Sequence, residues 1–217
     1  MTNLHIRPLK TEDHHKAIQF AIQGMNFQQY MDNTFLRQAY GQYFWYMEMA
    51  RATDVIAAYE GKELAGVLLV EMKGRPKIQQ SFFKKLYVTL FKGALSLFSK
   101  NGSGLYDHIN QKLKINYRAD YKPDGEIVFL AANPNTKTRG IGSLLLAELE
   151  KRYPNKEIYL YTDSNCTYQF YEKRGFERHG EQETVLDLGK HTSNLTCFLY
   201  RKRLADLPND WILFPLT

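Results

Sequence analysis

Residues 131–146 read AANPNTKTRGIGSLLL, and the rest of the chain is best interpreted outward from this stretch. An apolar run from Glu126 to Ala132 precedes it and has the composition of a buried strand. The breaker Pro134 follows the run, and residues 140–152 then show the spacing of an amphipathic helix. The sequence therefore predicts a strand, a loop and a helix in immediate succession.

The predicted loop has the features of a phosphate site. Gly140 and Gly142 stand where the loop passes into the helix, so a bulky anion can approach the backbone there. Free N–H groups and the positive end of the helix dipole bind anions, and Lys137 and Arg139 add positive charge. The stretch lacks the Gly-Lys-Ser/Thr of a Walker A loop and the GxGxxG of a dinucleotide site. The alternative is a helix that merely starts at glycines.

Two blocks of sequence resemble the GNAT superfamily of acetyl-CoA-dependent N-acetyltransferases. Residues 137–142, KTRGIG, are similar to the family's Arg/Gln-x-x-Gly-x-Gly/Ala signature, with Lys137 in the first position, which keeps the charge but loses the planar fork of arginine. Residues 165–176, NCTYQFYEKRGF, are similar to the family's Asn…Phe-Tyr-x-x-x-Gly-Phe region. The resemblance covers Glu126 to Phe176 most clearly.

The resemblance implies acetyl-CoA as co-substrate and assigns residues to it. It implies that main-chain groups of Leu130, Ala131 and Ala132 bind the pantetheine arm like an added strand. It also implies that the loop holds the pyrophosphate and that Asn165 contacts the cofactor. The loop residues concerned are Lys137, Thr138, Arg139, Gly140, Ile141, Gly142 and Ser143.

The implied reaction needs a base, a donor to the oxyanion and a proton for the leaving thiolate. The resemblance places the phenol of Tyr171 beside the thioester sulfur as general acid; the alternative is a core tyrosine that caps its helix. Glu126 is the candidate base through water, and the alternative is a solvated carboxylate at a strand end. Glu71 is a reserve base. Cys166, at the start of the helix expected over residues 166–174, suggests a rival acetyl-cysteine route.

Hydrophobic periodicity predicts a mixed α/β chain. The expected fold, as the resemblance also implies, is α/β (α+β): a mostly antiparallel central sheet with a splayed strand pair and helices on both faces. We expect residues 1–217 to form a single N-acetyltransferase domain. Strands are expected over residues 6–9, 55–59, 64–72, 126–132, 158–161, 176–188 and 196–203, and helices over residues 11–24, 34–50, 82–98, 140–152 and 166–174.

Positive charge is concentrated in one segment. The chain has 29 Lys and Arg against 23 Asp and Glu, and seven of the basic residues and no acidic one lie between Lys73 and Lys100. Residues 73–120 are expected to be a basic amphipathic helical insertion. Its helix, Phe82–Phe98, could pack on the sheet, form a wall over the acceptor site, or bind a membrane surface or a partner. A wall would favour an acidic acceptor.

Other classes of protein are disfavoured. No apolar run approaches the roughly 18 residues of a membrane span, and the start lacks a secretion signal, so we expect a cytoplasmic protein that binds no membrane. Two cysteines, Cys166 and Cys197, make no disulfide framework, and no histidine or cysteine spacing indicates a metal. Nucleic-acid binding rests on the basic segment alone, so none is expected.

The sequence thus predicts an enzyme that transfers an acetyl group from acetyl-CoA to a primary amine of a small molecule or peptide. Direct attack in a ternary complex is the expected mechanism. The alternative is a non-catalytic acyl-CoA-binding or sensor module on the same fold. A monomer or a homodimer is expected, and the acceptor is left open because the fold does not define the substrate.

Overall fold

A seven-stranded sheet organises the chain, in the order β1-β2-β3-β4-β5-β7-β6. The structure is a computed structural model and describes residues 4–29, 31–78, 81–98, 103–187 and 192–206. The strands are β1 (Leu4–Arg7), β2 (Asp54–Glu60), β3 (Glu63–Met72), β4 (Gly125–Ala132), β5 (Glu157–Asp163), β6 (Glu177–Asp187) and β7 (Thr192–Arg203). All neighbours pair antiparallel except β4 and β5, which are parallel.

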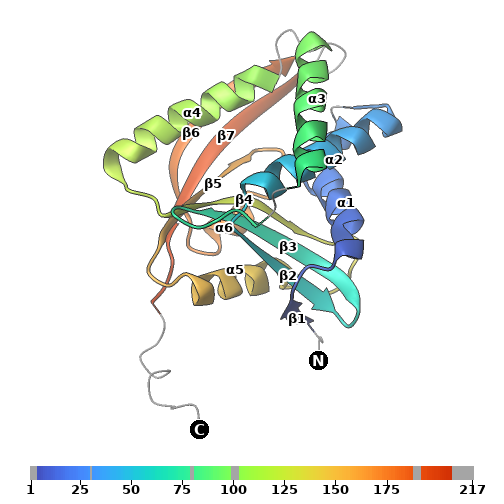
Figure 1. Cartoon of the computed structure of the whole chain (residues 1–217). Helices are drawn as coiled ribbons and strands as arrows, with labels where there is room; N and C mark the ends of the chain where they lie inside the picture. The colour runs from blue at the N-terminus through green and yellow to red at the C-terminus, as the bar shows by residue number, and fades with distance from the viewer. Residues whose placement is uncertain (1–3, 30, 79–80, 99–102, 188–191, 207–217) are drawn as a thin grey trace.

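Helices cover both faces of the sheet (Figure 1). The helices are α1 (His14–Gly24), α2 (Thr34–Arg51), α3 (Phe82–Phe98), α4 (Ser103–Asp120), α5 (Ile141–Arg152) and α6 (Gln169–Glu172), with short 3-10 turns at Thr11–Asp13 and Phe27–Gln29. Helix α5 packs on β1 to β4, and α1 and α2 pack on the other face. Helix α4 crosses β6 and β7, and α3 packs chiefly against α2. The expected α/β fold with helices on both faces is confirmed.

Strands β4 and β5 separate after three pairs. Their register runs only from Gly125 opposite Ile158 to Ile127 opposite Leu160. On the other edge of β4 the register with β3 shifts between Ile127 and Phe129, so Val128 is an extra residue in a β-bulge. The expected splayed pair is therefore present, and β5 does not pair with β4 from Val128 onward.

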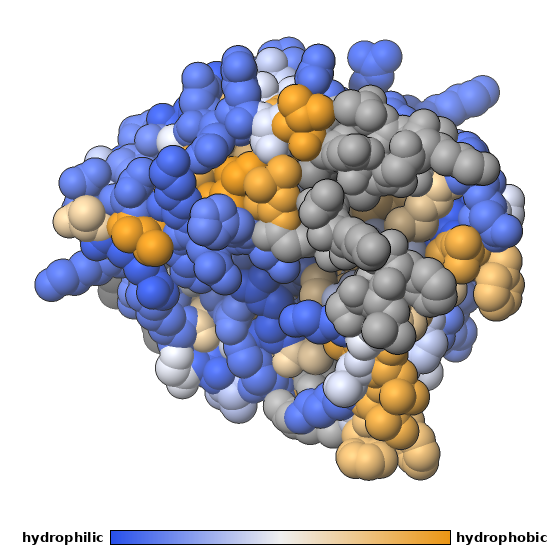
Figure 2. Space-filling view, turned by 90° about the horizontal axis from the view of Figure 1, so that it is seen from above, coloured by the Kyte–Doolittle hydropathy of each residue, from blue (hydrophilic) through white to orange (hydrophobic). Residues whose placement is uncertain are grey.

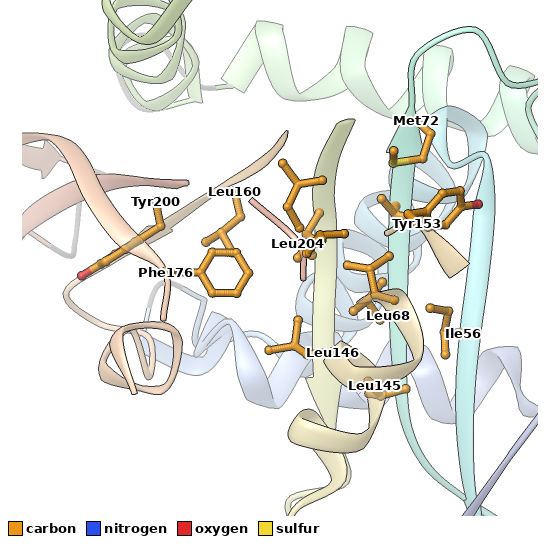
Figure 3. Close-up of a cluster of buried hydrophobic side chains, with 14 of the residues drawn as sticks. Ile56, Leu68, Met72, Leu145, Leu146, Tyr153, Leu160, Phe176, Tyr200 and Leu204 are labelled. Atoms are coloured by element: carbon orange, nitrogen blue, oxygen red, sulfur yellow. The ribbon is translucent and has the colours of Figure 1, made fainter. Parts of the chain in front are cut away.

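The main core lies between α5 and the sheet (Figure 3). Leu145 and Leu146 on the helix meet Leu68 on β3, while Leu160 of β5 and Leu204 after β7 come from the other side of the junction between β4 and β5. Their apolar faces follow helix and strand periodicities, so both sides of the splay are packed into one cluster. A second cluster, with Trp45 of α2, lies on the opposite face.

Some expected elements differ from those observed. Helix α4 occupies a stretch whose sequence signals are weak, because its apolar positions Ile109, Leu113 and Tyr117 are isolated among polar residues although they lie four apart. Helix α6 has only four residues rather than the nine expected over residues 166–174. Strand β1 starts and ends two residues earlier than expected, because Pro8 has no N–H for the ladder.

Helix α3 leaves part of its apolar stripe uncovered. Phe91 stacks on Tyr43 of α2, whereas Phe82 and Phe83 are 71% and 80% exposed. Figure 2 shows such apolar groups as separate patches among polar side chains. Of the three alternatives for this helix, packing of the stripe on the sheet is not what the structure shows, because α3 packs chiefly on α2. Among the described residues, no helix combines the length and apolar character that crossing a membrane requires.

Candidate active site

A cavity of about 510 Å³ fills the gap between the splayed strands. Its walls are β4 from Ile127 to Ala132, the beginning of α5, and the chain from Tyr161 to Arg174 that leads through α6. Gly24, Met25 and Phe44 close it from the side of α1 and α2. Because β5 has turned away, the edge of β4 here carries main-chain groups available for an extended ligand.

The loop before α5 turns at Gly140, whose φ of 85° is in the left-handed region that a glycine adopts without strain. No side chain in the described part of the chain caps this helix, so the first N–H groups of α5 are available to bind an anion. The loop is held from behind by Glu60 of β2, which accepts hydrogen bonds from Thr136 Oγ1 at 3.1 Å and Thr138 Oγ1 at 2.5 Å. Gly142 has another reason to be glycine, since a Cβ there would lie 2.8 Å from the Phe170 ring.

The cavity brings together most of the residues expected to bind the co-substrate. Those lining it are Leu130, Ala131, Ala132, Thr138, Gly140, Ile141, Gly142 and Ser143, together with Tyr171. Lys137 and Arg139 are exposed and are not among the lining residues, and neither is Asn165. The backbone of Asn165 is fixed by Asn26, whose side chain donates to the Asn165 carbonyl at 2.7 Å.

Arg174 is a lining residue that the sequence analysis missed. Its guanidinium donates from Nε to Ser143 Oγ at 2.9 Å and lies over the Phe170 ring, so a positive charge stands beside the first turn of α5. In the sequence, Arg174 is simply a basic residue before Gly175. Basic residues stand next to glycines at many surface turns, so this pattern did not single it out.

Tyr171 lies on α6 and faces the cavity. Its ring packs edge-on against Phe170 and Phe176. Burial, and then the neighbouring Cys166 thiol, raise the pKa of the Tyr171 phenol above its ordinary value. The phenol therefore stays protonated at neutral pH, which is the state that a proton donor needs.

The environment of Cys166 argues against the rival covalent route. The residue lines the cavity but lies three positions before α6, which itself has only four residues. Burial, followed by the nearby Asp163 carboxylate, raises the pKa of the Cys166 thiol to about 12. The helix-terminus effect expected to lower that pKa is absent, so the thiol is not activated as a nucleophile.

Glu126 is not the solvated strand-end carboxylate that was the alternative to a base. It is 4% exposed and accepts hydrogen bonds from Arg51 Nη2 at 2.7 Å and Tyr159 Oη at 2.6 Å. Glu71 is paired with Arg51 and Lys77. Neither carboxylate is among the residues that line the cavity.

Comparison with known proteins gives one family and one fold. The model of the acetyltransferase (GNAT) family matches residues 21–176. A structure described as histone acetyltransferase HPA2 and related acetyltransferase, from Corynebacterium glutamicum, is 15% identical with a TM-score of 0.56, and the alignment covers 96% of this chain and 99% of that one. Comparison with curated protein sequences gave no significant match.

Two further structures have the same fold. An N-acetyltransferase from Staphylococcus aureus Mu50 is 14% identical with a TM-score of 0.51, covering 94% of this chain and 99% of that one. The yncA structure from Salmonella typhimurium, which contains its cofactor acetyl-CoA, is 10% identical with a TM-score of 0.50, covering 94% and 96%. At sequence identities this low, the similarity to these structures shows a shared fold and nothing further.

Proposed function

The chain belongs to the acetyltransferase (GNAT) family, and on that premise we propose that it transfers an acetyl group from acetyl-CoA to a primary amine of a small molecule or peptide. Membership makes it an acyltransferase enzyme. The observation that carries the proposal is the coincidence, in one cavity, of an unpaired edge of β4, an uncapped helix N-terminus at Gly140 and the half-buried side chain of Tyr171.

Each part of the cavity has a task in the proposed binding mode. The extended pantetheine arm would hydrogen-bond with main-chain groups of Leu130, Ala131 and Ala132 as an added strand. The pyrophosphate would lie against the first N–H groups of α5, from Ile141 to Ser143, with Arg174 as an additional cation. Thr138 in the cavity lining, and Lys137, Arg139 and Asn165 outside it, are further proposed contacts.

The proposed chemistry is direct attack in a ternary complex. Acetyl-CoA supplies the acyl group as a thioester. The amine loses a proton, its nitrogen forms a bond to the acyl carbon and the carbon–sulfur bond breaks, so that the thiolate takes a proton from Tyr171 and solvent restores the phenol. A main-chain N–H at the β4 bulge would stabilise the negative charge that develops on the acyl oxygen.

We propose Glu126, through water, as the group that receives the proton of the amine, with Glu71 in reserve. Glu126 lies two residues before the bulge and is already fixed by Arg51 and Tyr159. Residues 1–217 are proposed to act as one domain with residues 73–120 as its helical insertion. No metal is assigned a role.

Calorimetry with acetyl-CoA, followed by a thiol-release assay with a panel of primary amines, tests the proposal. We expect saturable binding of acetyl-CoA and amine-dependent release of coenzyme A. Binding without any amine-dependent release would instead favour the non-catalytic acyl-CoA sensor. A protein that shows no heat at millimolar acetyl-CoA would not use the cavity as proposed.

A further inference from the structure

Four carboxylates and three cations gather on the sheet face opposite α5. The acids come from four elements: Glu48 of α2, Glu71 of β3, Glu126 of β4 and Asp107 of α4. The cations are Arg51, Lys77 and Lys114. Arg51 bonds both Glu71 and Glu126, Lys77 pairs with Glu71, and Lys114 lies 3.7 Å from Glu126. With every group ionised, this cluster has one negative charge in excess.

Glu48 is the member with a buried side-chain oxygen that lacks a donor among the described residues. Its side chain is only 8% exposed, and its Oε2 accepts no hydrogen bond. The nearest cation, Arg51 Nη1, lies 3.6 Å away, beyond hydrogen-bond reach, because the guanidinium is directed at Glu71 and Glu126. A buried carboxylate oxygen left without a donor is costly, so the site is incomplete as it stands.

A proton on Glu48 neutralises the excess negative charge of the cluster. Burial raises the pKa of Glu48 to about 8; Arg51 opposes this, while Glu126, Glu71 and Asp107 add to it. At pH 7 such a group is roughly nine-tenths protonated. A cation that entered the cluster would offer the missing donor and displace that proton.

The cluster adjoins the cavity of the proposed active site. Phe44 lines the cavity, and Glu48 is four residues further along the same face of α2, about 6 Å away along the helix axis. On the sheet, Val128 lines the cavity and Glu126 is two residues before it, about 7 Å along β4. Arg51, Glu71, Lys77 and Lys114 are each 30–35% exposed, so the rim of the cluster is open to solvent.

Helix α4 contributes a second acceptor without a donor. Oδ1 of Asn110 is buried and accepts no hydrogen bond. Asn110 lies one turn after Asp107 and one turn before Lys114, and therefore on the face of α4 that carries both charged residues of the cluster. The Asn110 side chain is itself bonded to Tyr106, so the oxygen that carries the argument is that of Glu48: buried, without a donor among the described residues and beside excess negative charge, it is suited to a ligand that brings N–H donors and positive charge.

We propose that the acceptor substrate is a diamine, and that Glu48 binds the ammonium group at its far end while the other amine meets the acyl group at the β4 bulge. This rests on the proposed function and names the substrate class of the same site. The charge balances on binding, because the ammonium group enters as a cation and the carboxyl proton of Glu48 leaves to solvent.

Calorimetry of the full chain with saturating coenzyme A, using 1,4-diaminobutane as the probe, tests this proposal. Titration in two buffers of different ionisation enthalpy gives the number of protons released. We expect most of one proton per site at pH 7 and clearly less at pH 8.5, because less of Glu48 is protonated there. The neutral-ended 1-aminobutane should bind at least about tenfold more weakly, since it lacks one charge-assisted hydrogen bond.

Glu48→Gln provides the decisive variant, because an amide replaces a mostly neutral carboxyl of the same shape. It should abolish the proton release and weaken binding of the diamine at least about tenfold, with little change for 1-aminobutane. Glu148→Gln is the matched control, because it removes a carboxylate on α5, on the opposite face, where Arg152 is its partner. Equal affinity for both amines, or unchanged proton release in Glu48→Gln, would overturn the proposal, and tighter binding of 4-aminobutanoate would favour an acidic acceptor instead.

The two proposals fail in different ways. If monoamines and diamines are acetylated alike and binding releases no proton, the proposed acetyltransferase activity stands and the proposed diamine subsite is wrong. If the diamine binds with release of a proton but no amine is acetylated, the cation site at Glu48 stands and the proposed reaction is wrong.

Discussion

Tyr171 is the single residue whose surroundings bear most directly on the proposed chemistry. Its ring contacts the rings of Phe170 and Phe176 and lies near a thiol, and no cation among the described residues stabilises its phenolate. The same packing that makes it part of the core also holds the proton in place at neutral pH. The two interpretations of this residue, core tyrosine and acid, are therefore compatible.

Replacing Tyr171 with Phe should lower kcat about a hundredfold and leave the affinity for acetyl-CoA within about twofold. The ring and its packing remain, and only the proton donor is lost. Steady-state kinetics together with calorimetry measure the two quantities. Tyr168→Phe is the matched control from the same loop, because Tyr168 stacks on Phe198 and is not among the cavity-lining residues. Equal turnover in the two variants would remove Tyr171 from the mechanism.

Replacing Cys166 with Ala should leave turnover within about threefold of the parent enzyme. A thiol with a pKa of about 12 has almost no thiolate at neutral pH, so it supplies no nucleophile. Mass spectrometry after incubation with acetyl-CoA should likewise find no acetyl group on Cys166. A stable acetyl adduct at this residue, or a hundredfold loss of rate, would restore the covalent route.

Sequence reasoning recovered the residues whose signal is local and missed those whose signal is not. Gly140 and Gly142 are visible because a loop between strand and helix restricts which residues fit. Glu48 carries no such signal: it is one charged residue in an aromatic helix, and its importance arises from Glu71, Glu126 and Asp107, which are distant in sequence. Arg174 gains its place only because Ser143, 31 residues earlier, lies beside it.

Strand β4 shows how one irregular element creates the site. The bulge at Val128 bends the strand just where pairing with β5 ends. The apolar run over residues 126–132 predicted this strand correctly, but the bulge depends on register with β3, which no local pattern encodes. The separation of β4 from β5 was predicted from the resemblance to a family and not from the composition of the strands.

Substitution of Gly140, the N-cap residue of α5, should change stability in the opposite direction to substitution of Gly93 inside α3. Gly140→Ala forces a side chain into the left-handed region and should cost about 1–2 kcal/mol of stability and weaken coenzyme A binding. Gly93→Ala lies in an exposed helical position where the added Cβ meets nothing within 4 Å, so it should add about 0.5–1 kcal/mol. Chemical denaturation of both variants measures the signs. A stabilising Gly140→Ala would mean that the loop does not hold the turn described.

The molecule as a whole is two groups of strands joined by a narrow seam. Strands β1 to β4 and β5 to β7 share only the three register pairs between β4 and β5. The cluster under α5 spans this seam, with Leu145 on one side and Leu204 on the other (Figure 3). The cavity can open between the strands because the hydrophobic core, rather than the ladder, holds the two groups together.

This arrangement predicts that the two groups unfold together. Leu145→Ala and Leu204→Ala remove matched side chains, 0% and 2% exposed, from opposite sides of the seam, and each should cost about 2–5 kcal/mol. For a chain of this length each should lower Tm by at least about 4 °C, within one calorimetric transition. If either variant produced two transitions of which only one moved, the groups would fold independently. A ligand that bridges the splay, as acetyl-CoA is proposed to do, should raise the single Tm of both variants, because it binds only when the two groups are in place.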